Sequence, residues 1–140
     1  MSEAVSSDRV EPEGVVITSV EEVKRFLNEG KELLEKDELV QACEKIYKAA
    51  EDAMKILAKE YTPEVYDVAE KNGKWLASLL REAVRKIEDR LGEDVGRGWY
   101  AAWFLHVEGF HERRLSKEDI TWGLKHVKKL VDLLERSRSS

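Results

Sequence analysis

The sequence predicts an all-α protein, an up-down bundle of about five helices, because apolar residues recur at helical spacing along most of its length. Composition agrees: of 140 residues, 42% are apolar and 38% charged, with two Pro and eight Gly. A β-sandwich needs more turns and more β-branched runs than this chain contains. The length is that of one domain, which is large enough to bury a core without disulfides or metals.

The expected organisation is a flexible N-terminal segment, a helical bundle and a short tail. Residues 1–18 have no sustained periodicity and are expected to be flexible, the bundle is expected over 19–136, and residues 137–140 are expected to fray. The first helix begins at Ser19, whose spacing to Glu22 is that of a capping box. Its apolar stripe starts at Val20 and Val23.

Turn and cap residues divide the middle of the chain. Asp37 is expected to cap a second helix, whose apolar stripe is rich in Ala. Pro63 predicts the start of a short helix over 63–71, which Asn72 and Gly73 end. A third long helix is expected over 74–91, with Gly92 just beyond its C-terminus.

The fourth helix is expected over 99–114, after a loop over 93–98. It reads WYAAWFLHVEGFHERR and is apolar all round for more than two turns, which is typical of a helix buried on most sides. Ser116 and Asp119 then have the spacing of a cap that opens the last helix.

Charge and cysteine usage narrow the class of protein. The formal net charge is −5, and basic residues are interleaved with acids, so nonspecific binding to nucleic acid is not expected. The longest apolar run, Trp99 to Val107, is far short of the roughly 20 residues that span a bilayer. No secretory signal opens the chain, and its one cysteine, Cys43, cannot form an internal disulfide. We therefore expect a cytoplasmic protein without membrane association.

One face of the fourth helix contains the main ligand-binding candidates. At about 100° per residue these share a sector: Trp99, Trp103, His106, Phe110 and Arg113. They form either an aromatic-walled pocket for a planar ligand such as a nucleobase, or a core aromatic cluster with a hydrogen-bonded histidine. A further candidate, Arg97, lies between two glycines just before this helix, where backbone N–H groups favour an anion.

The opposite face of that helix has half of a metal-binding pattern. Glu108 and His111 have the spacing that di-metal bundles use, with Glu112 next to them. The chain has no second copy of the Glu-x-x-His pattern on another helix, so we expect neither a bound metal nor another cofactor. Cys43 has no histidine near it in sequence, which disfavours nucleophilic catalysis.

Two stretches resemble known families. FLNEGKELLEKDELVQACEKIYKAAEDAMKILAKEY resembles the first two helices of HEPN domains, and GWYAAWFLHVEGFHE resembles the archaeal PaREP family of helical proteins, which is grouped near HEPN. The resemblance implies a helical bundle that dimerises and associates with nucleotidyltransferases or acts as an RNase. Catalytic HEPN domains have an arginine a few residues before a histidine, and no histidine of this chain has an arginine at that spacing.

The prediction is therefore a noncatalytic HEPN-like binding module, homodimeric, that engages a nucleotide or a nucleotidyltransferase-type partner. Two alternatives stay open. One is an enzyme that acts on RNA or nucleotides through His106, Arg113 and Arg97, and the other is a purely structural interaction protein. A cleft that reaches His106 would favour a ligand, and a sealed His106 would favour interaction.

Overall fold

The structure is a computed structural model that describes residues 18–139. The segment 1–18, expected to be flexible, lies outside these residues except for Thr18. Within the described part there are six α-helices, one π-helical turn and no strands, which confirms the all-α prediction. The elements are α1 (Val20–Glu35), α2 (Leu39–Tyr61), α3 (Pro63–Asn72), α4 (Ala77–Leu91), α5 (Glu93–Phe104), η2 (Leu105–His111) and α6 (Lys117–Ser139).

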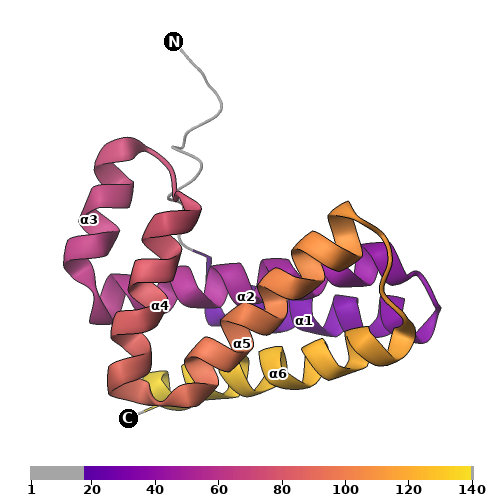
Figure 1. Cartoon of the computed structure of the whole chain (residues 1–140). Coiled ribbons are helices and arrows are strands. Elements are labelled where there is room, and N and C mark those ends of the chain that lie inside the picture. Colours follow the sequence, from indigo (N-terminus) through magenta and orange to yellow (C-terminus); the bar gives the residue numbers. More distant parts are fainter. Residues whose placement is uncertain (1–17, 140) are drawn as a thin grey trace.

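Helix α2 lies at the centre and contacts every other element of the bundle. Helices α1, α2 and α6 pack together, while α3 and α4 form a pair at one end (Figure 1). Helix α5 and its continuation η2 cross over α2 and α6. Among residues 18–139, no helix combines the length and the apolar character that crossing a membrane requires.

Capping residues explain several helix starts. The Ser19 hydroxyl accepts from the Glu22 backbone N–H at 3.1 Å, as predicted. At the start of α6, the Asp119 N–H donates to the Ser116 hydroxyl and the Ser116 N–H donates to the Asp119 carboxylate, each at 3.1 Å. Both backbone N–H groups are thereby hydrogen-bonded, which is the capping arrangement that the spacing predicts.

Three predicted helix starts differ from the structure. The segment 93–98 is helical rather than a loop: Glu93 and Asp94 form an acidic first turn, which the helix dipole favours. Glu38, not Asp37, is the N-cap of α2, because Asp37 takes a left-handed φ of 61°. Helix α4 starts at Ala77 rather than near residue 74. Helix α6 extends through Ser139.

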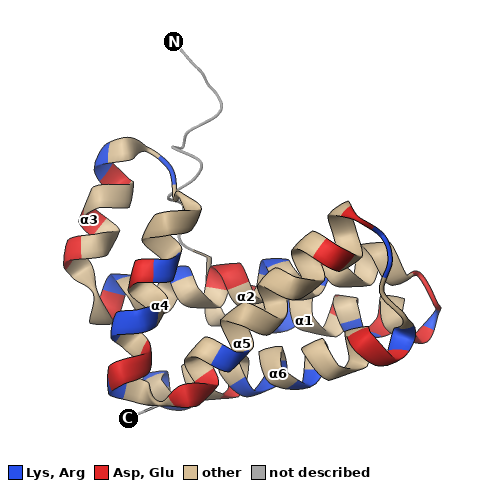
Figure 2. Cartoon of the chain, in the orientation of Figure 1, with Lys and Arg blue, Asp and Glu red and all other residues tan. Residues whose placement is uncertain are grey.

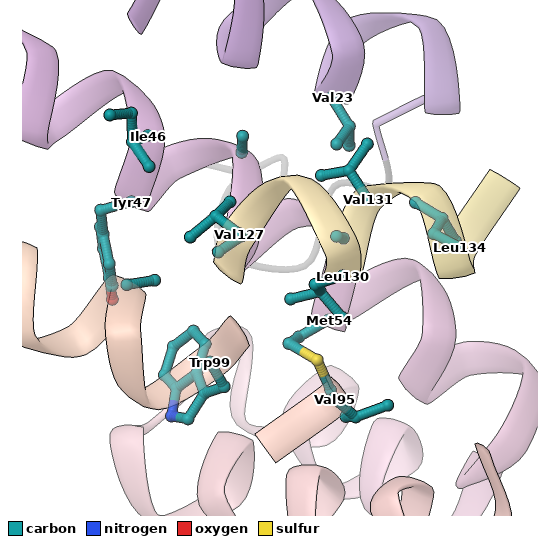
Figure 3. Close-up of a cluster of buried hydrophobic side chains, with 14 of the residues drawn as sticks. Val23, Ile46, Tyr47, Met54, Val95, Trp99, Val127, Leu130, Val131 and Leu134 are labelled. Carbon is teal, nitrogen blue, oxygen red and sulfur yellow. The ribbon is translucent and has the colours of Figure 1, made fainter. Parts of the chain in front are cut away.

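The core is formed mainly by side chains of α1, α2, α4, α5 and α6, and Figure 3 shows the part of it between α1, α2, α5 and α6. Trp99 of α5 is 1% exposed and lies among Met54 of α2 and Leu130 of α6. Helix α5 approaches α6 closely at Gly98, where a Cβ would lie 2.6 Å from the Leu130 Cβ. The outer surface is a mixture of acidic and basic residues, but α5 and η2 have few of either (Figure 2).

Candidate functional site

The helix predicted over 99–114 changes geometry in its second half. From Leu105 to His111 the backbone is π-helical, and the Glu112 N–H donates to the Val107 carbonyl, five residues back, at 3.0 Å. Such wide turns are rare and occur often at functional sites. In an α-helix, side chains five residues apart point about 140° away from each other. The wider turn instead brings the Nε2 atoms of His106 and His111 to 3.1 Å. The prediction that these histidines occupy opposite faces was wrong.

Contacts on both sides hold the π turn in place. Gly109 packs against Cys43 of α2, and a Cβ at this position would collide with the Cys43 sulfur. The absence of a side chain therefore lets η2 approach α2 closely. Beyond the turn, Arg113 takes a left-handed φ of 59°, and the Arg114 Nε donates to the Glu108 carboxylate at 2.6 Å. Glu108 thus pairs with Arg114 and not with His111.

The two histidines and two residues of α2 form what we call the histidine cluster: Glu44, Tyr47, His106 and His111. The His106 ring stacks on the Tyr47 ring at a centroid distance of 4.0 Å and an angle of 18°. Its Nδ1 lies 3.9 Å from Glu44 Oε1, which is too long for a hydrogen bond. Both atoms are buried and have no hydrogen-bond partner within the described residues. The His106 side chain is 20% exposed, so it is neither sealed in the core nor open to solvent.

Burial shifts the titration of this cluster toward neutral side chains. Desolvation lowers the pKa of His106, and the nearby His111 lowers it further. Desolvation also raises the pKa of the Glu44 carboxyl, and the neighbouring Glu51 adds to that rise. The Glu51 carboxylate accepts a hydrogen bond from the Tyr47 hydroxyl at 3.2 Å. The cluster therefore favours a neutral imidazole at His106.

Four of the five residues of the predicted face remain in ring contact, with Trp99 6.2 Å from Trp103 and Trp103 5.5 Å from His106. Trp99 belongs to the core, whereas Trp103 is 36% exposed at the surface. Phe110 is partly buried, and its ring is nearly parallel to that of His106 at 6.1 Å. Arg113 is exposed and follows the end of η2, so it leaves the face that an unbroken α-helix would give it. The rings of this sector therefore form a cluster that extends from the core to the surface.

The arginines of the enzyme alternative do not meet at His106. Arg97 is in the first turns of α5 and pairs with Glu93 at 2.6 Å. Arg113 follows the other end of the same helix, more than about 20 Å away at 1.5 Å per residue. A site that uses His106, Arg113 and Arg97 together is not assembled. Likewise, residues 18–139 contain no set of three or more His, Cys, Asp or Glu side chains that could hold a metal, so Glu108, His111 and Glu112 are not placed as ligands of a common ion.

A second surface feature, which we call the aromatic groove, was missed by sequence reasoning. It lies between α5 and α6, has a volume of about 580 Å³, and is lined by Arg97, Tyr100, Ala101, Phe104, Asp119, Trp122 and His126. Tyr100 and Trp122 are 49% and 50% exposed. The Trp122 ring contacts Phe104 at 5.9 Å and His126 at 4.8 Å. The available signal was that Trp122 falls outside the apolar stripe of its helix.

Both signs of charge lie near the groove: Arg97 and Asp119 line it, and Lys125 and Lys129 are close enough to His126 to affect its pKa. Desolvation is the main cause that lowers the pKa of His126, and the nearby Lys129, Lys125 and Arg97 lower it further. Asp94 acts in the opposite direction. The His126 Nδ1 is buried and has no hydrogen-bond partner in the described part of the chain. The groove thus combines exposed rings with nearby cations.

The fold and these two features define an all-α bundle protein whose aromatic and histidine side chains gather where α5 and η2 meet α2 and α6. A model of the archaeal PaREP1/PaREP8 family matches residues 18–131, and the chain belongs to this family. It is similar to a protein from Sulfolobus solfataricus whose crystal structure is known, with a sequence identity of 35%. The two structures have a TM-score of 0.78, and the match covers 84% of this chain and 97% of that one. A solution structure of the same structural-genomics target matches with a sequence identity of 34% and a TM-score of 0.73. That match covers 86% of this chain and 92% of the other. No curated protein matches the chain.

Proposed function

We propose that this chain is a noncatalytic, HEPN-like binding module that acts as a homodimer through its aromatic groove. The observation that supports this is the exposure of large rings at the groove: Tyr100 and Trp122 are each about half exposed. Exposed aromatic side chains around an apolar groove mark interaction surfaces, where covering them removes apolar area from water. Trp and Tyr are also the residues that most often dominate interface energetics.

A second copy of the chain fits this surface in charge as well. Arg97 and Asp119 both line the groove, so each copy presents both signs of charge. A two-fold interface is self-complementary, and in the proposed dimer Arg97 of one protomer pairs with Asp119 of its partner. The resemblance of the chain to HEPN domains also implies dimerisation. The conclusion is a homodimer centred on α5 and α6.

The mass of the protein in solution tests this proposal. We expect light scattering at on the order of tens of micromolar to give the mass of a dimer. Trp122→Lys should give a monomer with unchanged helical circular dichroism, because Trp122 is at the surface. The matched control is Val68→Lys: Val68 is 44% exposed but lies on α3, away from the groove, so this variant should stay dimeric. A monomeric wild type, or a dimeric Trp122→Lys variant, would contradict the proposal.

The cations near the groove favour a second candidate, the binding of a nucleotide. The rings of Tyr100 and Trp122 would stack on a base, and Arg97, Lys125 and Lys129 would attract its phosphates. The two occupants would compete, so an added adenine nucleotide that shifts the dimer to monomer would favour this candidate. A nucleotidyltransferase-type partner rests on the family resemblance alone, and copurification from the native host tests it. The enzyme alternative has no support in this geometry.

A further inference from the structure

We propose that His106 and His111 form a binding site for a divalent transition-metal ion that prefers nitrogen ligands, such as Zn²⁺, with Glu44 orienting His106. The site is independent of the aromatic groove. It is built by the π turn, which places the Nε2 atoms of the two rings 3.1 Å apart. A regular α-helix could not bring side chains five residues apart into this position.

The spacing of the two nitrogens suits a shared ion. Zn–N bonds are about 2.0–2.1 Å long, so two nitrogens 3.1 Å apart subtend about 95° at a common metal. That angle is close to the cis angle of octahedral and square-planar ions, and a small widening reaches the tetrahedral value. The ion would take the place of the single proton that one imidazole otherwise donates to the other.

The other ring nitrogen of His106 faces a carboxylate, as the second nitrogen of a metal-binding histidine commonly does. Metal-binding histidines donate their remaining N–H to a carboxylate or carbonyl, which fixes the tautomer and the ring direction. His106 Nδ1 faces Glu44 Oε1 at 3.9 Å, and neither atom has another hydrogen-bond partner in the described residues. A small rotation of the Glu44 side chain would close this bond. Tyr47, stacked on the ring at 4.0 Å, limits its other movements.

Access and ligand number define the kind of site. His111 is exposed, so an ion reaches the pair from solvent. Two side-chain ligands leave the remaining positions to water or an external ligand, so the ion should exchange freely. Imidazole nitrogens select zinc, copper and nickel over magnesium and calcium, which prefer oxygen ligands.

Calorimetric titration of the full chain with Zn²⁺ tests the site. We expect one ion per chain, no comparable binding of Mg²⁺, and shifts of the His106 and His111 ring signals in NMR spectra. His111→Ala should weaken Zn²⁺ binding at least tenfold, and because His111 is exposed the variant should remain folded. His126→Ala removes the one other histidine of the chain and should leave the Zn²⁺ stoichiometry unchanged.

Glu44→Gln separates the orienting role from the ligand role. Loss of a second-layer carboxylate costs on the order of tenfold to a hundredfold in metal affinity, and we expect the stoichiometry to stay at one ion. The Trp122→Lys variant should bind Zn²⁺ as the wild type does, so a failure of the dimer proposal leaves this result unaffected. Absence of Zn²⁺ binding, equal binding by His111→Ala, or equal binding of Mg²⁺ would overturn the inference.

Discussion

Individual side chains around η2 show how burial controls chemistry in this protein. Cys43 is fully buried on α2, where it meets Gly109 of the π turn. Desolvation raises the pKa of its thiol to about 11. Because the thiolate is the nucleophile, this cysteine should be inert in the native state. The glycine opposite it has a positional role, since any side chain there would displace η2 from α2.

The reactivity of Cys43 is a direct measure of that burial. At pH 8 we expect a thiol-specific reagent to label the folded protein at least about a hundredfold more slowly than the unfolded chain, from the difference in thiolate fraction. The folded-state pKa lies above the unfolded value, so the associated stability is complete below about pH 8.5 and is lost as the pH rises toward 11. Rapid labelling under native conditions, with denatured protein as the control, would contradict the buried position.

At the scale of elements, the contact between α5 and α6 depends on small residues. At Gly98 a Cβ would lie 2.6 Å from the Leu130 Cβ and 3.1 Å from the His126 carbonyl oxygen. Neither atom is the free end of a flexible side chain, so a new methyl group would push the helices apart. Gly123 of α6 also lacks room for a side chain, because a Cβ there would collide with the Leu105 side chain of η2.

Two glycines of α5 should respond oppositely to alanine. Gly98→Ala should lower the free energy of unfolding by about 1–3 kcal/mol, because overpacking outweighs the gain in helix propensity. Gly96→Ala is the matched control: its Cβ would meet only the Glu88 carboxylate, which ends a flexible side chain. That variant should be more stable than the wild type by up to about 1 kcal/mol. Urea denaturation of both variants tests the pair, and equal effects would show that helix propensity alone decides.

At the scale of the whole molecule, the fold rests on a continuous apolar core. Buried residues from all of α1, α2, α4, α5 and α6 belong to it, and α2 contributes the largest share. The histidine cluster lies at the margin of this core, since His106 is partly exposed and His111 is exposed. Folding should therefore not require the proposed metal site to be occupied.

A chelator should leave the folding of the purified protein unchanged. We expect the melting temperature with and without a strong chelator to agree within about 2 °C, because metal-dependent domains lose most of their stability on chelation and this core needs no metal. Added Zn²⁺ would raise the melting temperature only by its mass-action effect on the folded state. A large fall on chelation would instead identify the metal as a structural component.

The sequence by itself determined the helical class, the family and most helix ends. The signals that predicted these features are local: periodic apolar residues, Pro63 and the caps at Ser19 and Ser116. Each acts through hydrogen bonds and packing within a few residues of the chain. The prediction of a loop over 93–98 failed because two glycines suggested a turn. The acidic first turn at Glu93 was an available signal in the opposite direction.

Only the tertiary structure decided where the candidate sites are. The grouping of Trp99, His106 and Arg113 assumed a constant period of 3.6 residues, and the π turn breaks that period after Phe104. Its cause is packing between segments distant in sequence, with Gly109 seated on Cys43 of α2. The exposure of Trp122 likewise depends on which helix covers which face. The sequence contains the residues of both sites, but contacts between the helices of the bundle decide which of these residues lie close together.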